Sequence, residues 1–98
     1  MRFYFADSKL ERLYTDEKDA HKYPEGIPNA FFDVMGVIAG AKDERDLRAL
    51  VSLRYEKLKG KRSHQRSLRL NDQYRLVVER EEDEDGYVFR IVALEDYH

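Results

Sequence analysis

The pattern of apolar positions divides the chain into a mainly helical first half and a second half of strands. Residues 1–5 are apolar and aromatic and predict a first strand, and residues 9–16 carry apolar side chains at helical spacing. Pro28 suits the first turn of a helix whose apolar positions then follow at i, i+3, i+4 and i+7, up to Gly40. Asp43 is placed to cap a further short helix.

After Ser52 the apolar period changes to two, which is typical of β-strands. This alternation predicts four strands, at Tyr55 to Leu58, Gln65 to Leu70, Tyr74 to Glu81 and Tyr87 to Leu94. No repeat or low-complexity tract interrupts the chain, so we expect a single domain over residues 1–98. The predicted fold class is α+β, with helices packed on one face of a largely antiparallel sheet of four to five strands.

The hairpin between the second and third of these four strands has two possible registers. A two-residue turn would set Arg69 opposite Tyr74, whereas a three-residue turn sets Leu68 opposite Leu76. We prefer the second register because it collects the apolar residues on one face. It also places Arg69 opposite Arg75 on the other face, where like charges repel each other by ~0.2–1 kcal/mol. An anion between them would reverse this effect, so the hairpin itself indicates a phosphate site.

Composition supports a folded, soluble protein. Apolar residues make up 42% of the 98 residues, enough for one small core. The chain has no cysteine, which excludes a disulfide framework and a cysteine-ligated metal site. No stretch approaches the ~20 apolar residues that span a bilayer, and an acid follows too soon after the start for a secretory signal. We therefore expect a cytoplasmic protein without membrane contact.

Charge is distributed very unevenly along the chain. The whole protein carries a net charge of −2, yet residues 54–75 hold eight basic and only two acidic side chains, a net charge of +6. We expect the cations of this basic stretch to lack carboxylate partners. Such a cationic strip is typical of a surface that holds the phosphates of a nucleic acid. The alternative is a solvated face of ordinary sheet that binds nothing.

The last three residues, Asp96, Tyr97 and His98, include groups that can move a proton. A histidine is the natural proton shuttle near neutral pH, and Asp96 would favour its charged form. Tyr97 could stack on a base, or merely pack. The alternative is a frayed and idle terminus. The histidines show no metal-ligand spacing, and no phosphate-cradling glycine loop is present, so we expect no metal or other cofactor.

Two motifs resemble a known family. The stretch from Leu58 to Leu76 reads L-K-G-K-R-S-H-Q-R-S-L-R-L-N-D-Q-Y-R-L, and the chain ends in E-D-Y-H. Both resemble the HigB toxins of the RelE/ParE superfamily, also called plasmid-maintenance killer proteins, and the resemblance covers essentially the whole chain. It implies a RelE-like domain that enters the ribosomal A site, cuts the message being decoded and is neutralised by a HigA-type helix-turn-helix antitoxin. We expect the free toxin to be a monomer.

The resemblance and the basic stretch together assign roles to residues. The active site takes Arg75, Asp96, Tyr97 and His98, and contacts to RNA phosphates are assigned to Lys59, Lys61, Arg62, His64, Arg66, Arg69 and Tyr74. The sequence departs from the family pattern at three of these positions. Lys61 stands where the family often has Asp, His64 replaces the usual Gly, and Arg66 occupies a position often filled by an aromatic residue or His. If the position of Arg66 supplies the second catalytic imidazole of the family, Arg66 cannot make the same proton transfer at neutral pH, and His64, two residues earlier, is the candidate to replace it.

These features predict RNA cleavage without a metal, in which the ribose 2′-hydroxyl attacks its own 3′ phosphate. His98 would act as general base or acid, oriented by Asp96, while arginines hold the phosphate. Two alternatives stay open. ParE-like relatives have a similar fold and poison DNA gyrase without cutting RNA, and an inactive relic would bind only its antitoxin. The terminal histidine favours the nuclease, because a gyrase binder has no evident need for an imidazole there.

Overall fold

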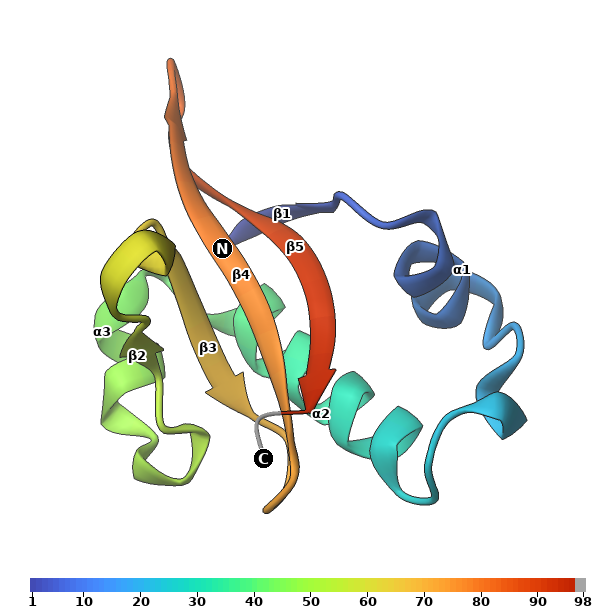
Figure 1. The fold of residues 1–98 in the computed structure, drawn as a ribbon. Helices are drawn as coiled ribbons and strands as arrows, with labels where there is room; N and C mark the ends of the chain where they lie inside the picture. Colours follow the sequence, from blue (N-terminus) through green and yellow to red (C-terminus); the bar gives the residue numbers. More distant parts are fainter. Residues whose placement is uncertain (97–98) are drawn as a thin grey trace.

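The computed structural model describes residues 1–96, which form a five-stranded sheet with helices on one face (Figure 1). Along the chain the elements are β1 (Arg2–Phe5), α1 (Ser8–Asp16), η1 (Ala20–Lys22), α2 (Ile27–Gly40), α3 (Glu44–Ala49), η2 (Val51–Leu53), β2 (Glu56–Lys57), η3 (Gly60–Arg62), β3 (Gln65–Arg69), β4 (Tyr74–Asp83) and β5 (Gly86–Asp96). The strand order is β1-β5-β4-β3-β2, with β1 parallel to β5 and the other neighbours antiparallel. The predicted α+β class is confirmed.

The helices begin where the sequence predicts and bury their apolar stripes against the sheet. Asp43 caps α3 by accepting a hydrogen bond of 2.8 Å from the Arg45 N–H, and Pro28 lies in the first turn of α2. The main buried side chains of helices and strands form one core, built from Leu10, Leu13, Ile27, Phe31, Met35, Ile38, Leu47, Leu68, Leu76, Val78, Phe89 and Ile91. Removing these apolar surfaces from water is the main force that holds the helices on the sheet.

A β-bulge in β5 decides which of its side chains face the helices. Val78 of β4 pairs with Ile91 of β5. The preceding residue, Val77, pairs with Ala93, so one residue of β5 between these pairs is extra. The bulge allows Ile91 and Leu94, which are three residues apart, to pack against the core together. The residue after Leu94 then points to the opposite face of the sheet, where the candidate site lies.

The predicted register of the hairpin between β3 and β4 is confirmed. Leu68 lies opposite Leu76, and Arg69 lies opposite Arg75. The three-residue turn is stabilised by Asn71, whose side-chain oxygen accepts hydrogen bonds from the backbone N–H groups two and three residues ahead, at 2.9 and 2.7 Å. The alternation of apolar residues was therefore sufficient to choose between the two registers.

The strand predicted at residues 55–58 is shorter than expected, because β2 contains only Glu56–Lys57. The side chain of Tyr55 turns toward the helices instead of continuing a ladder. Its hydroxyl donates a hydrogen bond of 2.8 Å to the carboxylate of Glu44, and its ring packs against Phe89 with 6.1 Å between centroids. Burial, together with the bond to Glu44, raises the pKa of Tyr55. Packing with α3 therefore replaces strand pairing at this position.

The hairpin between β4 and β5 is longer than predicted. β4 extends to Asp83 and β5 begins at Gly86, so residues 84–85 alone form the turn in place of a loop over residues 82–86. Gly86 has a φ of +108°, a backbone conformation that glycine adopts without steric cost. The tip of this hairpin projects beyond the rest of the sheet (Figure 1).

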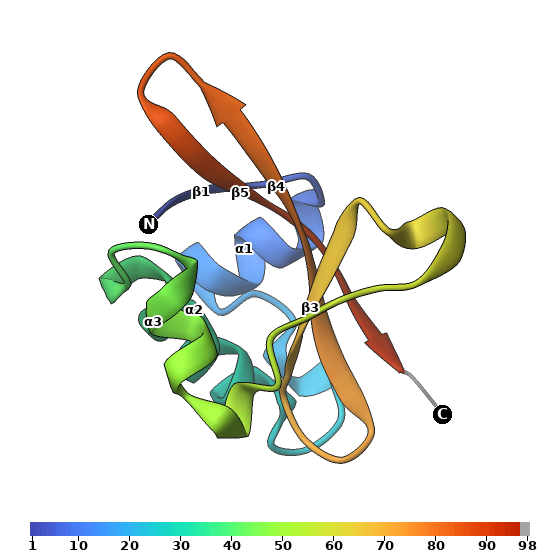
Figure 2. The same cartoon turned by 90° about the vertical axis from the view of Figure 1, so that its left-hand side faces the viewer.

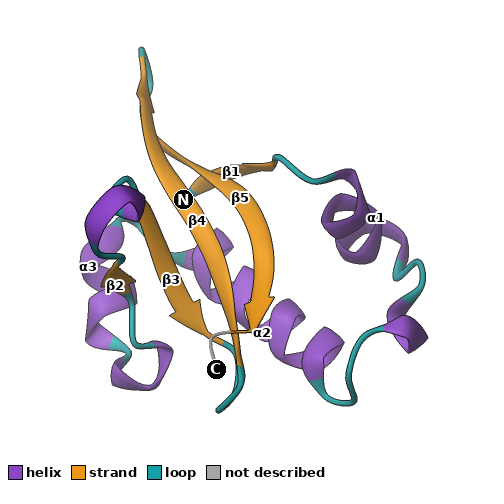
Figure 3. Cartoon of the chain, viewed as in Figure 1, coloured by secondary structure: helices purple, strands orange, loops and turns teal. Residues whose placement is uncertain are grey.

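The sheet has one face covered by helices and one face that they leave open. Figure 2 shows α1, α2 and α3 on one side of the strands and η3 on the other, and Figure 3 distinguishes the helices from the strands by colour. We call the second side the open face; it is formed by the residues that alternate with the core positions, including Gln65, Ser67, Arg69, Arg75, Val77, Glu79, Arg90, Ala93 and Glu95. Within residues 1–96, no helix is long and apolar enough to cross a membrane.

Candidate nucleic-acid interface

Alternation along three strands brings charged side chains together on the open face. Arg69 of β3 lies opposite Arg75 of β4, which in turn lies opposite Glu95 of β5. Residues directly opposite each other have Cα atoms roughly 4.5–5.5 Å apart, so these three side chains form one row across the sheet. The hairpin register predicts the two arginines of this row, and the pairing of β5 with β4 adds the carboxylate of Glu95 to them.

Two arginines share this carboxylate. Arg62 of η3 reaches Glu95 across β4 and donates two hydrogen bonds of 2.7 and 2.6 Å, and Arg75 donates a third of 2.8 Å. Arg69 forms an ion pair with Asp72 in the turn. The expectation that cations of the basic stretch lack carboxylate partners is therefore wrong for these three arginines. For Arg62 and Arg75 the reason is that Glu95 lies outside the stretch in sequence and reaches it only through the pairing of β5 with β4. For Arg69 the partner is one of the two acids of the stretch itself, three residues ahead in the turn.

This arrangement keeps Glu95 ionised. The hydrogen bonds from Arg62, and then those from Arg75, lower the pKa of Glu95 from 4.5 to about 2, although partial burial opposes the shift. Two guanidinium groups against one carboxylate leave an excess positive charge on this part of the open face. That charge can attract a phosphate, and the planar guanidinium groups can donate paired hydrogen bonds to it.

The ion pairs of Glu95 with Arg62 and Arg75 should make the free energy of unfolding depend on pH. The pKa of Glu95 is depressed in the folded protein, so its contribution is complete above the ordinary pKa of 4.5 and is lost as the pH falls toward about 2. We expect the wild type to exceed Glu95→Gln in free energy of unfolding by on the order of 1–2 kcal/mol above pH 5, a value reduced by solvent screening of this partly exposed group. Urea unfolding of both proteins between pH 7 and pH 2 measures this difference. A difference that stays constant with pH would contradict the account.

A second cluster lies farther along the open face. Glu79 accepts hydrogen bonds from Gln65 at 3.0 Å and from Arg90 at 2.9 Å, and these contacts lower the pKa of Glu79. His64 lies 3.6 Å from the same carboxylate. Glu79 is four positions from Arg75 on β4, which is roughly 13 Å of extended chain. His64 therefore lies with the second cluster and not beside the row at Arg75.

Two neighbouring hollows adjoin Arg75. The smaller, of about 130 Å³, is lined by Arg54, Glu56, Ser67, Arg69 and Arg75. The larger, of about 340 Å³, is lined by Glu56, Lys57, Leu58, Lys59, Arg62 and Arg75. Basic side chains predominate in both, and the two hollows share Arg75. The surface is thus a shallow basic groove, the form expected for holding the backbone of a single-stranded nucleic acid.

The other residues predicted to bind RNA divide between this groove and the covered face. Lys59 lines the larger hollow, and Lys61 is exposed in η3. Arg66 and Tyr74 belong to the covered side, because they share the alternation of the core residues; Tyr74 packs against the core. The structure therefore does not bring these two side chains together with Arg75 on the open face.

β5 carries the chain toward the same row. Asp96 is the last residue of β5, one position beyond Glu95, and accepts a hydrogen bond of 2.9 Å from Gln73 in the hairpin turn. Tyr97 and His98, which the sequence assigns to the active site, lie outside the described residues. Asp96 lies opposite Tyr74, one position beyond the Arg75–Glu95 pair of the β4–β5 ladder, so alternation turns its side chain toward the covered side and away from Arg75.

Glu95 is the functional residue that the sequence-based assignment lacks. It stands directly before the terminal D-Y-H motif, yet its role depends on arginines 20 and 33 positions earlier in the chain. A signal for its orientation was present in the sequence. Since Leu94 continues the apolar alternation, the next residue had to face away from the core.

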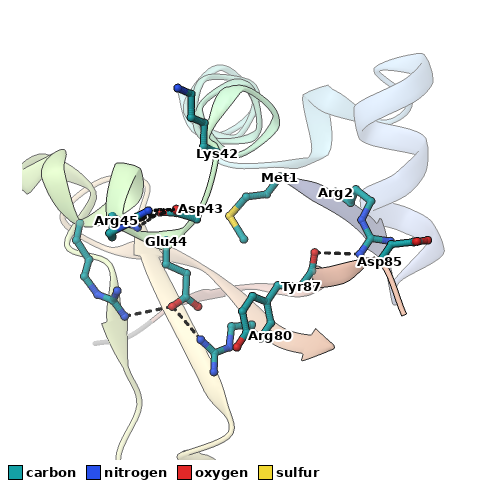
Figure 4. A pocket seen from close by; sticks show the side chains of 10 residues that line it. Met1, Arg2, Lys42, Asp43, Glu44, Arg45, Arg80, Asp85 and Tyr87 are labelled. Carbon is teal, nitrogen blue, oxygen red and sulfur yellow. Dashed lines mark hydrogen bonds and ion pairs between the residues drawn. The ribbon is translucent and has the colours of Figure 1, made fainter. Parts of the chain in front are cut away.

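Another hollow lies on the covered side, between α3 and the β4–β5 hairpin (Figure 4). Its centre is the largely buried Glu44, which accepts hydrogen bonds of 3.2 Å from both Arg48 and Arg80 as well as the bond from Tyr55. Arg80 also lies over the ring of Tyr87, 4.4 Å from its centroid. None of the predicted site residues lines this hollow. Residues 1–96 contain no group of three or more His, Cys, Asp or Glu that could hold a metal ion.

Known proteins similar to this chain are bacterial toxins. A model of the family described as "RelE-like toxin of type II toxin-antitoxin system HigB" matches residues 3–98. Toxin HigB-1 from Vibrio cholerae serotype O1 is 37% identical over 79 residues, which are 81% of this chain and 83% of that protein. A YoeB/ParE toxin from Agrobacterium tumefaciens has a similar fold, with a TM-score of 0.58 and 14% identity over 100% of both chains. The chain therefore belongs to the HigB family of RelE-like toxins of type II toxin–antitoxin systems.

Proposed function

We propose that this toxin is a ribosome-dependent endonuclease that cuts messenger RNA during translation. The observation that carries the proposal is the basic groove around Arg75 on the open face, adjacent to the end of β5, in a chain of the HigB family. Cutting the message would inhibit translation in the cytoplasm. The proposed partners are mRNA on the ribosome and a HigA-type antitoxin with a helix-turn-helix.

In this proposal the groove holds the phosphate that is cut. Arg75 and Arg69 contact its oxygens, with Lys59 assisting from the larger hollow. The negative charge on the phosphate grows as the 2′-hydroxyl attacks, so cations fixed at this position stabilise the transition state more than the ground state. Glu95 keeps Arg75 oriented. Because Glu95 also binds Arg62, its single negative charge does not fully neutralise Arg75.

Proton transfer is assigned to the end of the chain. His98 is the general base or acid, and Asp96 orients it. Tyr97 positions the nucleobase beside the cut. Attack of the 2′-hydroxyl needs one group to remove its proton and one to protonate the departing 5′ oxygen, and positioned side chains accelerate such steps by ~10²–10⁴-fold. No metal ion is required for this route. The ribosome contributes the geometry, because the message must be held with the attacking oxygen, phosphorus and leaving oxygen in line.

Mapping of message 5′ ends tests this function. Purified toxin is added to translating ribosomes beside His98→Ala and the control His21→Ala, which replaces an exposed histidine of η1. We expect new 5′ ends inside codons with the wild type and the control, and at least ~10²-fold fewer with His98→Ala, because a proton-transfer group is lost.

Two results would overturn the proposal at different levels. Identical ends with the wild type and His98→Ala would show that the site assignment is wrong. An absence of new ends, with DNA damage signalling rising before translation stops in cells that express the toxin, would favour the gyrase-binding alternative.

A further inference from the structure

We infer that Arg54 and Ser67 complete a second phosphate subsite, which holds the RNA phosphate next to the one at Arg75. The inference rests on the proposed function, and it concerns two residues to which neither the sequence motifs nor the family resemblance assign a role. The subsite is the smaller of the two hollows, with a volume of about 130 Å³. Its ligand class is a phosphodiester of single-stranded RNA.

The position of this hollow suits a neighbouring phosphate. Arg75 lines both hollows and lies opposite Arg69, so a strand whose cut phosphate contacts these two arginines can place the next phosphate beside Arg54 and Ser67 in the smaller hollow without leaving the groove. Ser67 lies at the middle of the sheet, opposite Glu56 of β2 and Val77 of β4, and only 7% of its surface is exposed. Its hydroxyl is therefore held on rigid strands at the floor of the hollow, where it can donate to a phosphate oxygen.

Arg54 supplies the charge of this subsite. Within residues 1–96 it forms no ion pair with a carboxylate, whereas Arg69 and Arg75 each contact one. Glu56 is the acidic residue that lines the hollow, so three arginines outweigh one carboxylate there. A group with this excess of positive charge is stabilised when a phosphate enters.

The backbone at Arg54 gives independent support for a role of its side chain. Arg54 directly follows η2 and has φ +46° and ψ +52°, the left-handed conformation that glycine adopts most easily. A side chain at such a position has a local steric cost, and residues of this kind cluster at functional sites. Glycine would serve the turn at least as well, so the turn itself does not explain the arginine.

This conformation allows a variant that separates binding from folding. In Arg54→Gly the guanidinium group is lost while the left-handed turn is relaxed. If Arg54 binds phosphate, the variant should lose affinity for the oligonucleotide without losing stability. If Arg54 serves only the turn, the affinity should stay unchanged. The ligands are a 2′-deoxy dinucleotide with one internucleotide phosphate and a 2′-deoxy trinucleotide with two. Titrations followed by NMR of the protein amides give the affinity for each, and urea unfolding gives the stability.

We expect the wild type to bind the trinucleotide several-fold more tightly than the dinucleotide, with shift changes at the Arg54 and Ser67 amides. Arg54→Gly should lose this preference, with a decrease of about 0.7 in the slope of log affinity against log salt for the trinucleotide, and unfold at an equal or higher urea concentration. Glu56→Gln should strengthen trinucleotide binding. Arg12→Ala, which removes an exposed arginine of α1, should change neither affinity.

Equal affinity of the wild type for the two ligands, or an unchanged trinucleotide preference in Arg54→Gly, would overturn the second subsite. Message cleavage by the wild type on ribosomes is measured in parallel. Cleavage without a trinucleotide preference would refute the subsite and leave the proposed function standing. Absence of cleavage would refute the proposed function, whatever the oligonucleotide affinities are.

Discussion

Replacing Arg75 with alanine is expected to slow message cleavage on ribosomes by about 10²–10³-fold, because the variant loses a fixed cation at the phosphate that gains charge in the transition state. Arg75 lines both hollows and lies in the middle of the row across β3, β4 and β5. Glu95 keeps its two hydrogen bonds from Arg62 in the variant, so the fold should be retained. The cleavage rate at saturating ribosome concentration and the urea unfolding midpoint measure the two effects.

Two matched variants make this result specific. Arg75→Lys keeps the charge but loses the planar pair of N–H donors, so we expect an intermediate rate. Arg90→Ala removes another arginine of the open face. Arg90 is bound to Glu79, which lies roughly 13 Å from Arg75 along β4, so this variant should leave the rate nearly unchanged. Full activity of a folded Arg75→Ala protein would mean that the groove does not hold the phosphate that is cut.

Most of the fold could be predicted from apolar alternation alone. A shift of one residue in the hairpin would have placed Leu68 and Leu76 on different faces of the sheet, and the burial of both is too favourable for that register to compete. One exception, besides the longer β4–β5 hairpin, is the strand expected to begin at Tyr55. Its length was set by the contact of Tyr55 with Glu44 of α3, a tertiary contact that local periodicity does not reveal.

The candidate site was less predictable, for two different physical reasons. The family motif groups Arg66 and Tyr74 with Arg75. The alternation of apolar residues on β3 and β4, however, already indicated that Arg66 and Tyr74 face the covered side, so this part could have been predicted from the sequence. The role of Glu95 is different, because its partner Arg62 is far away in the chain and extends from η3 across β4. Clusters of charge in sequence show where cations are concentrated, but not which carboxylates the fold brings to them.

In the proposed reaction, RNA bound to the open face is cut by its own ribose 2′-hydroxyl. In that reaction the 2′ oxygen forms a bond to phosphorus while the bond to the 5′ oxygen breaks, which leaves a cyclic phosphate on one fragment and a 5′-hydroxyl on the other. Without the 2′ oxygen there is no nucleophile, although every contact of the arginines with the phosphate can still form. Removing this oxygen should therefore abolish the chemical step and leave binding nearly intact, the largest effect expected for any single change.

The most direct test is a message with a single 2′-deoxy substitution at the cleaved nucleotide, translated with purified ribosomes and wild-type toxin. A second message, with the substitution in a neighbouring codon that the toxin does not cut, serves as the control. We predict that cleavage at the substituted position falls to the level without toxin, while the control is cut at the normal rate to give a 5′-hydroxyl end. Cleavage of the substituted linkage at an unchanged rate would contradict the account.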